Sequence, residues 1–397
     1  MRTTSRVSPA IVGMLPAAMA VATIFYTMVS VLATSMIDDL QITRAELGWV
    51  VTVFSVVAAL ISPTIGGVAD RLGAKRAMLW VFLFVSLGFL LLSRATALPW
   101  VMGSVVVIAV GQAMSNPSTN KMIALQIPAG RRGLITGIKQ SGVQMGTFVG
   151  GLAFPALAVA GGWRVAPAAI GFTGLALLAL AAATLPTTEP GLATARADRP
   201  PLPPGTNWIT LYAFLMGAGG SPIFSFLPLY AQEAVGVSES YAGLLIAIGG
   251  LVGLTARIAW SVIAERRHSS GPMAAIAALA VISIALTMLA EPWGVAVLWL
   301  ATVAAYLSMS AWNSVAMLTV ITTAGPRGAG RASGVVLMGF LAGLAASPPL
   351  FGWSVDRLGT YQPGLAATGI LFALGLITVL IWRRQVTSRG ELGRPLP

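Results

Sequence analysis

Three cationic side chains, Lys121, Lys139 and Arg257, lie inside apolar stretches of this sequence. All the Asp and Glu residues fall in polar segments or at the edges of apolar ones. A buried charge must be paired, hydrated or used in function, because leaving it bare costs several kcal/mol. Cations without an acidic partner in the same stretches therefore predict the binding of an anion.

Arg257 is the strongest candidate for this role. It precedes Glu265 by eight residues, which places it about 12 Å along a helix from the nearest polar end. A planar guanidinium can bind both oxygens of a carboxylate, which a lysine ammonium cannot do as well. The alternative is a structural bond from Arg257 to backbone carbonyls at a broken helix.

Lys121 and Lys139 each lie about 9 Å from the end of an apolar stretch. A lysine side chain can reach the membrane surface from that depth, and this is the favoured interpretation for both residues. Pointing inward, they would instead add to a positive cavity that concentrates anions.

Amide side chains recur every four residues at Gln112, Asn116 and Asn120, which forms one polar stripe on a helix. Such a stripe either lines a cavity or bonds a neighbouring helix. Cavity lining is favoured because Asn313, next to Trp312, occupies the corresponding place in the second half of the chain. Trp312 is a further candidate substrate contact, although lone aromatic residues in membrane helices more often only pack.

The stretch 133–160 has two distinct faces. Gly142, Gly146 and Gly150 repeat every four residues and predict a close helix-packing surface. Gln140 and Gln144 lie about 200° away around the same helix. We take these glutamines, with Tyr26 from the first apolar stretch, as further candidate substrate contacts.

The composition places these residues in a membrane protein. Of the 397 residues, 56% are hydrophobic and only 9% are charged, against about 25% charged in soluble domains. Apolar runs long enough to span a bilayer recur along the chain. The chain has no Cys, and its single histidine, His268, lies in a polar segment, so we expect neither a metal site nor a cofactor.

We predict an all-α integral membrane fold with two six-helix bundles. The first bundle covers 1–185, a proline-rich cytoplasmic linker covers 186–205, and the second bundle and a short basic tail cover 206–397. The predicted membrane helices are 9–35, 44–68, 77–93, 98–126, 133–160, 165–185, 206–231, 240–264, 272–290, 293–323, 330–353 and 363–382.

The positive charges set the orientation. Most Lys and Arg residues between these helices fall on the side of both termini, and those on the other side are Arg44, Arg94, Arg164 and Arg357. The excess of positive charge marks the cytoplasmic side. We therefore expect a multi-pass protein of the inner (plasma) membrane with cytoplasmic termini. The net charge of +12 belongs to that face, and no nucleic-acid partner is needed to explain it.

The two halves repeat one another. At an offset of 197, Asn116, Gly142 and Gly146 fall on Asn313, Gly339 and Gly343. Internal repeats of this kind are typical of secondary transporters, which bind substrate near the bilayer midplane.

The segment between the second and third apolar stretches reads Gly66-Gly-Val-Ala-Asp-Arg-Leu-Gly-Ala-Lys-Arg76. It resembles the cytoplasmic loop between helices 2 and 3 of the major facilitator superfamily. The resemblance implies twelve helices in two bundles related by a pseudo-two-fold axis, with alternating access to a central site. It also implies a gating role for the matching residues, namely Gly66, Asp70, Arg71, Gly73, Lys75 and Arg76.

Two shorter resemblances point to different cargoes. Ala256-Arg257, followed by Ala259, resembles helix 8 of monocarboxylate transporters, which implies that Arg257 binds the substrate carboxylate. In that family an acidic residue for proton coupling stands one helical turn before the arginine, and this chain has Gly253 at that position. The glycine pattern of 133–151 resembles the helix 5 motif of drug–proton antiporters, except that Thr147 stands where that family has proline.

The leading hypothesis is a monomeric carrier for a small organic anion, most simply a monocarboxylate, with a proton as a candidate second partner. The alternative is a drug or metabolite exporter working as a proton antiporter. An enzyme is not expected, because the apolar stretches contain no catalytic constellation of acids, His or Cys.

Overall fold

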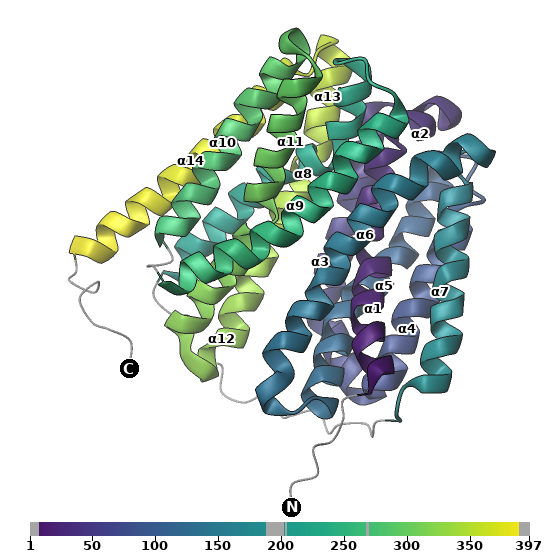
Figure 1. The fold of residues 1–397 in the computed structure, drawn as a ribbon, viewed down its shortest axis with the longest axis vertical. Helices are drawn as coiled ribbons and strands as arrows, with labels where there is room; N and C mark the ends of the chain where they lie inside the picture. Colours follow the sequence, from purple (N-terminus) through teal and green to yellow (C-terminus); the bar gives the residue numbers. More distant parts are fainter. Residues whose placement is uncertain (1–7, 188–201, 203–204, 267–269, 389–397) are drawn as a thin grey trace, which may run out of the picture. The chain divides into compact units, whose positions relative to one another are not determined.

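The computed structural model describes residues 8–187, 202, 205–266 and 270–388. Every regular element in this described part is a helix (Figure 1). It contains 12 spans that are long and apolar enough to cross a membrane. The predicted all-α membrane fold and its number of spans are therefore confirmed.

The chain divides into two compact units, each described here by itself. The first contains residues 1–195 and 238–250. Its elements are α1 (Pro9–Val31), α2 (Ala33–Leu40), α3 (Arg44–Leu72), α4 (Ala74–Leu92), α5 (Leu98–Gln126), the short 3₁₀ helix η1 (Ala129–Arg131), α6 (Arg132–Gly161), α7 (Val165–Thr184) and the first part of α9 (Glu239–Arg266).

The second unit contains residues 196–237 and 251–397. Its elements are α8 (Thr206–Glu233), the rest of α9, α10 (Ser270–Trp293), α11 (Val295–Met309), α12 (Trp312–Ala346), α13 (Pro348–Leu358) and α14 (Gln362–Ser388). Of the predicted linker 186–205, most residues lie outside the described part, as does the end of the basic tail.

Both units use the same internal packing. In the first, α6 packs on α1 and α5 on α4; in the second, α12 packs on α8 and α11 on α10. Glycines allow the close approaches: Gly142 lies against the carbonyl of Pro16 on α1, and Gly343 against the carbonyl of Phe214 on α8. The repeat in the sequence is thus a repeat of helix contacts.

The predicted charged loop between the second and third spans is mostly helical. Helix α3 continues to Leu72 and α4 begins at Ala74, so Gly73 alone joins them. Gly73 has φ +81°, a region that residues with a Cβ rarely occupy. The sequence suggested a longer loop because charged residues are typical of loops. Charged residues also occur at helix ends, which is where the structure places Arg71, Lys75 and Arg76.

Helix boundaries in the second unit also differ from the prediction. The predicted helix 293–323 is interrupted at Ser310 and Ala311, where α11 ends and α12 begins. Helix α12 then runs through the predicted loop 324–329 and ends at Ala346. Side chains of α9 donate hydrogen bonds to the freed carbonyls of Leu307 and Ser310, which stabilises the interruption.

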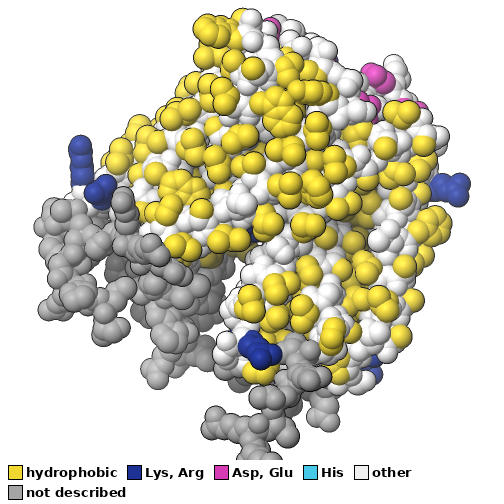
Figure 2. Space-filling view, in the orientation of Figure 1, with side chains coloured by type: hydrophobic (Ala, Val, Ile, Leu, Met, Phe, Trp, Pro, Cys, Tyr) yellow, Lys and Arg dark blue, Asp and Glu magenta, His cyan; other side chains and the backbone are white. Residues whose placement is uncertain are grey.

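The molecular surface fits a lipid environment. On the face drawn in Figure 2, hydrophobic side chains predominate and the few charged ones lie toward its margins. Large apolar side chains are strongly exposed, among them Leu60, Val159, Phe172 and Trp293. Apolar exposure on this scale marks a surface that another apolar phase covers.

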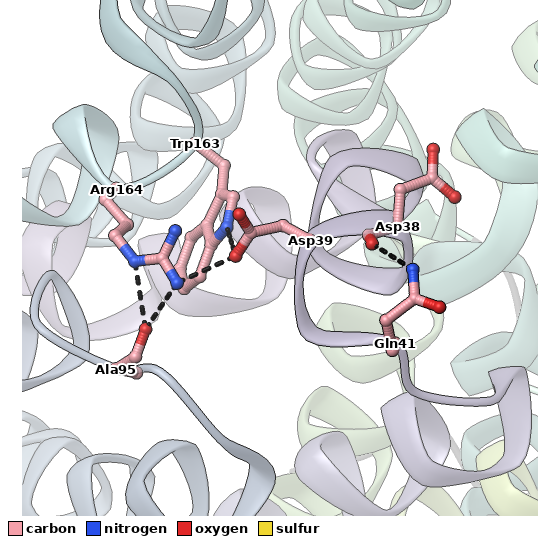
Figure 3. Close-up of polar contacts among 6 residues, drawn as sticks. All are labelled: Asp38, Asp39, Gln41, Ala95, Trp163 and Arg164. Atoms are coloured by element: carbon pink, nitrogen blue, oxygen red, sulfur yellow. Dashed lines mark hydrogen bonds and ion pairs between the residues drawn. The ribbon is translucent and has the colours of Figure 1, made fainter.

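A polar clamp joins three segments of the first unit (Figure 3). The Arg164 guanidinium lies 2.7 Å from Asp39 Oδ2 and donates to the Ala95 carbonyl from both Nε (2.9 Å) and a terminal nitrogen (2.7 Å). The indole of Trp163 donates to the same Asp39 oxygen at 3.2 Å. The clamp thus ties the end of α2 to the turns before α5 and α7.

The clamp also sets the acidity of Asp39. Hydrogen bonds from Arg164 and then Trp163 hold the pKa of this carboxyl below its ordinary value of 3.8. A carboxyl whose pKa is lower in the folded state stabilises the fold above its unfolded pKa, and that contribution disappears as the pH falls through the folded pKa. Both side chains are partly exposed, 42% for Asp39 and 33% for Arg164, so the contribution is small.

We predict that Asp39→Asn lowers the free energy of unfolding near neutral pH by about 0.5–1 kcal/mol. The difference from wild type should shrink as the pH falls below about 4, where the wild-type carboxylate becomes protonated. Thermal unfolding in detergent over a pH series measures this. Asp38→Asn is the matched control, because its carboxylate is exposed and points away from the clamp (Figure 3). Equal effects of the two variants would contradict the clamp.

A second prediction concerns the α1–α6 contact. In Gly142→Ala the new Cβ would overlap the Pro16 carbonyl, so we expect a loss of stability of about 1–3 kcal/mol from overpacking. Gly137→Ala on the same helix is the control, because nothing lies within 4 Å of its Cβ position, and alanine there should be neutral or stabilising. Thermal unfolding of the two variants tests this; an unchanged Gly142→Ala would contradict the close approach.

Candidate functional site

Lys139 on α6 lies at the centre of a polar cluster in the first unit. Its Nζ donates to Asn116 Oδ1 at 2.9 Å and to Asn120 Oδ1 at 2.7 Å, both on α5. The Lys139 side chain is only 1% exposed. The predicted route of this side chain to the membrane surface is therefore not taken, because two amide oxygens meet it inside the protein.

Helix α5 positions the two amides. Asn116 and Asn120 are four residues apart, so their side chains lie one turn apart on one face. Pro117 lies between them inside α5 and lacks the N–H that would bond the carbonyl one turn earlier. The hydroxyl of Thr119 donates to the carbonyls of Ser115 (2.6 Å) and Asn116 (3.1 Å), which holds this turn together.

The lysine also fixes the orientation of both amides. A lysine ammonium only donates hydrogen bonds, so it must face the Oδ1 atoms, and the NH₂ groups of Asn116 and Asn120 turn away from it. Both asparagines are exposed while Lys139 is buried beneath them. In the described part of the chain, no hydrogen bond uses these NH₂ groups. The cluster therefore presents amide N–H donors, which suit an anion.

The predicted glutamines do not join this cluster. Gln112 and Gln140 are half-buried and Gln144 is buried. None of the three side chains forms a hydrogen bond to another described residue. Their predicted contact with substrate stays a prediction.

Lys121 points elsewhere. Its Nζ donates to the Ala69 carbonyl at 3.3 Å, near the end of α3, where a positive charge is favourable because helix carbonyls are exposed there. Lys121 and Lys139 therefore have different environments, although the sequence predicted for both that the side chain reaches the membrane surface.

Tyr26 has a local polar partner. Its hydroxyl lies 3.1 Å from Ser55 Oγ on α3. Its ring packs edge-on to Phe54, at 5.0 Å between centroids. This arrangement holds α1 to α3.

The predicted packing glycines of α6 face α1. A Cβ on Gly146 would lie 3.3 Å from Ala20, and one on Gly150 would lie 3.0 Å from Thr27. Thr147, which replaces the proline of the antiporter motif, is bonded to Thr27 through their hydroxyls at 3.3 Å. These contacts hold the helix that carries Lys139 close to α1.

Arg257 is the predicted cation of the second unit. It is half-buried on α9, and its Nε donates to the Ser310 carbonyl at 2.9 Å. Ser310 is the first residue of the interruption between α11 and α12. The predicted alternative, a bond to a backbone carbonyl at a broken helix, is thus present. It uses one nitrogen of three, and within the described residues the two terminal nitrogens have no acceptor.

Trp260 is a site residue that the sequence interpretation missed. Its indole Nε1 donates to the Leu307 carbonyl at 3.0 Å, one turn before the bond made by Arg257. The signal available was its spacing, because residues three apart on a helix share a face. Trp260 and Arg257 together supply the donors that the interrupted helix lacks.

The predicted residues after the interruption have distinct environments. Trp312 is buried and packs on Phe340, with 4.4 Å between ring centroids. The Oδ1 atom of Asn313 is buried and has no hydrogen-bond partner in the described part. Asn313 therefore offers an unused acceptor in the first turn of α12.

The predicted gating segment is described only in part. Arg71 and Arg76 are exposed and Lys75 is half-buried. The side chain of Asp70 and the environment of Gly66 lie outside what is described. The gating role of this segment stays a prediction. No group of acidic, His or Cys residues suited to a metal ion occurs in the described ranges.

Comparisons with known proteins agree with this architecture. Residues 14–338 match the family model described as Major Facilitator Superfamily. A bacterial homolog of the human lysosomal transporter Spinster, in an inward-facing and occupied conformation, has the same fold, with a TM-score of 0.76 at 17% identity over 94% of this chain and 96% of that one.

Three of the relatives are described by the compound that they transport. A probable sulfoacetate transporter of Cupriavidus necator is 22% identical over 93% of this chain and 94% of its own length. A gallate transporter of Pseudomonas putida is 35% identical over 42% of this chain and 37% of its own. A hexuronate transporter of Bacillus subtilis is 31% identical over 37% of this chain and 35% of its own.

The family model covers most of the sequence, and the twelve apolar spans and the helix packing fit a solved transporter of this fold. The chain therefore belongs to the major facilitator superfamily of membrane transporters.

Proposed function

We propose that this protein transports a small organic anion, most simply a monocarboxylate, across the inner membrane by alternating access. The observation that carries the proposal is the Lys139 cluster, in which a buried cation turns the NH₂ groups of Asn116 and Asn120 outward. Amide donors above an uncompensated positive charge attract and orient an anion.

Arg257 provides the second supporting observation. The bond from Nε to Ser310 fixes the guanidinium plane and leaves the two terminal nitrogens, which form the edge that binds a carboxylate with two parallel hydrogen bonds. Three relatives are described as transporters of sulfoacetate, gallate and hexuronate, which are organic anions, whereas two others are described as a methylenomycin A resistance protein and a multidrug resistance protein B homolog. We propose that Arg257 is an anchor for the substrate carboxylate.

The remaining predictions complete the proposal. The two six-helix bundles would work as the moving parts of a monomer, with both termini in the cytoplasm. The segment from Gly66 to Arg76 would control opening on the cytoplasmic side.

Substrate counterflow into proteoliposomes tests the function itself, with labelled gallate, sulfoacetate and a hexuronate as probes. Efflux of lipophilic cations driven by a proton gradient, with no anion counterflow, would favour the exporter alternative instead.

Substitution of Arg257 tests the anchor. Arg257→Lys keeps the charge but loses the pair of parallel N–H donors, and Arg257→Ala loses both the charge and the donors. Hydrogen bonds to charged groups contribute about 1.5–3 kcal/mol, so we expect the half-saturating anion concentration to rise about 10- to 100-fold, with Arg257→Ala the more severe. Initial rates of counterflow against substrate concentration measure this.

Trp260→Phe is the matched control for Arg257. It removes the neighbouring bond to the interrupted helix, at Leu307, but leaves the guanidinium in place. A purely structural role for Arg257 predicts that Trp260→Phe weakens transport as much as Arg257→Lys. The anchor role predicts that Trp260→Phe keeps the half-saturating concentration near that of wild type.

Asn120→Asp tests the outward amide donors. The carboxylate is nearly isosteric but replaces NH₂ with an oxygen that repels an anion. A like charge about 8 Å away costs about 2 kcal/mol at an effective dielectric constant of 20, or about 30-fold in affinity. We expect at least that loss in anion counterflow. Gln126→Glu makes the same change of charge at the end of α5 and should transport normally; equal losses would point to a nonspecific charge effect.

A further inference from the structure

We propose that Lys139 is a proton-binding site and that its ammonium group carries the proton coupled to anion transport. This inference rests on the proposed function and adds to it the identity of the coupling ion and of the residue that binds it. Three features of the cluster support it, namely its hydrogen-bond count, its burial and its surroundings.

The hydrogen-bond count of Lys139 suits both protonation states. Its Nζ has two acceptors in the described part of the chain, Asn116 Oδ1 and Asn120 Oδ1. A neutral amine has two N–H bonds, which match these acceptors, and a lone pair. An ammonium has a third N–H bond, which finds no further protein acceptor there. Loss of the proton therefore breaks no hydrogen bond to the protein.

Burial makes the charged state costly without a counter-ion. The Lys139 side chain is 1% exposed and lies on a membrane-spanning helix. A buried ammonium loses its hydration, and neutral amide dipoles replace only part of it. An arginine at this place would stay charged, whereas lysine can release its proton when buried. The site is thus suited to change charge during the transport cycle.

The groups around α6 leave this charge uncompensated. Helix α7 has no titratable residue. On the other elements near α6, the Tyr26 hydroxyl faces Ser55 and Lys121 binds Ala69. At the start of α6 itself, Arg132 binds the Ala124 and Ile127 carbonyls. Arg131 in η1 is exposed. In the adjoining part of α9, Glu239 accepts a bond from Ser35, and Tyr241 is the other titratable group. None of these forms an ion pair with Lys139.

A bound anion would supply the missing charge. An anion held by the outward NH₂ groups about 8 Å from Nζ raises the proton affinity of the amine about 30-fold at an effective dielectric constant of 20. The coupling is reciprocal, so the proton tightens anion binding by the same factor. The proton comes from the solution on the side where the anion enters, forms an N–H bond with the Nζ lone pair, and is released to solution on the other side.

Proteoliposomes loaded with a pH-sensitive dye test this by following proton entry together with uptake of labelled anion. Gallate serves as the monocarboxylate probe and sulfoacetate as the dianionic probe. We expect one proton to enter with each anion in wild type, and an imposed proton gradient to drive accumulation. A ratio of zero in wild type, with anion uptake still present, would overturn the inference and leave the proposed function intact. Failure of both probes to move in wild type, by net uptake or counterflow, would instead contradict the proposed function.

Two variants locate the proton. Lys139→Arg is charged at all accessible pH values, and Lys139→Gln is never charged. Both should show a proton-to-anion ratio of zero, whatever their remaining rate of counterflow, because neither can change its protonation. A ratio of one in Lys139→Arg would place the coupling proton elsewhere and overturn the inference.

A measurement on the wild-type protein covers the case in which both variants fail to fold. Calorimetric titration of the purified protein with gallate, in buffers of different ionisation enthalpy, gives the number of protons taken up on binding. With a 30-fold coupling we expect uptake to peak at about 0.7 proton per anion, at a pH between the midpoints of the free and the anion-bound amine, and to fall toward zero at lower and at higher pH. Binding with no proton uptake at any pH would overturn the inference.

Discussion

The bond from the buried Lys139 ammonium to two asparagine oxygens is the interaction on which the candidate site depends. It requires α6 to lie close to its neighbours, and the glycines facing α1 allow this approach. It also requires Asn116 and Asn120 to share one face of α5. When both conditions hold, one buried side chain fixes the direction of the amide donors of Asn116 and Asn120. Helix packing and ligand chemistry are therefore linked through one side chain.

The two halves repeat their packing but not their charges. The glycine contacts of α6 on α1 recur in α12 on α8. At the same offset of 197, however, Lys139 corresponds to Val336, and at the offset of 195 Arg257 corresponds to Ser62. A repeated fold supplies two similar scaffolds, and each can acquire its own polar group without disturbing the other.

Sequence patterns predicted what depends on local periodicity. Apolar runs predicted the twelve spans of the described residues, and glycines four residues apart fall on close helix contacts. Features that depend on a partner far away in the sequence could not be predicted from the sequence alone. The depth of Lys139 permitted either direction, and only the position of α5 decides between them. The interruption at Ser310 carries no local signal, because the donors that stabilise it come from Arg257 and Trp260 on another helix.

The two cations differ in a way that suits a transport cycle. An arginine keeps its charge under all physiological conditions, whereas a buried lysine can exist as a neutral amine. A carrier with two permanent cations would return empty with both charges bare in the membrane, at a cost of several kcal/mol each. If Lys139 carries the coupled proton as we infer, release of that proton with the anion removes one of these charges, and the Ser310 carbonyl partly compensates the other at Arg257. The empty carrier then changes conformation with one buried charge. If both residues were arginine, it would have two.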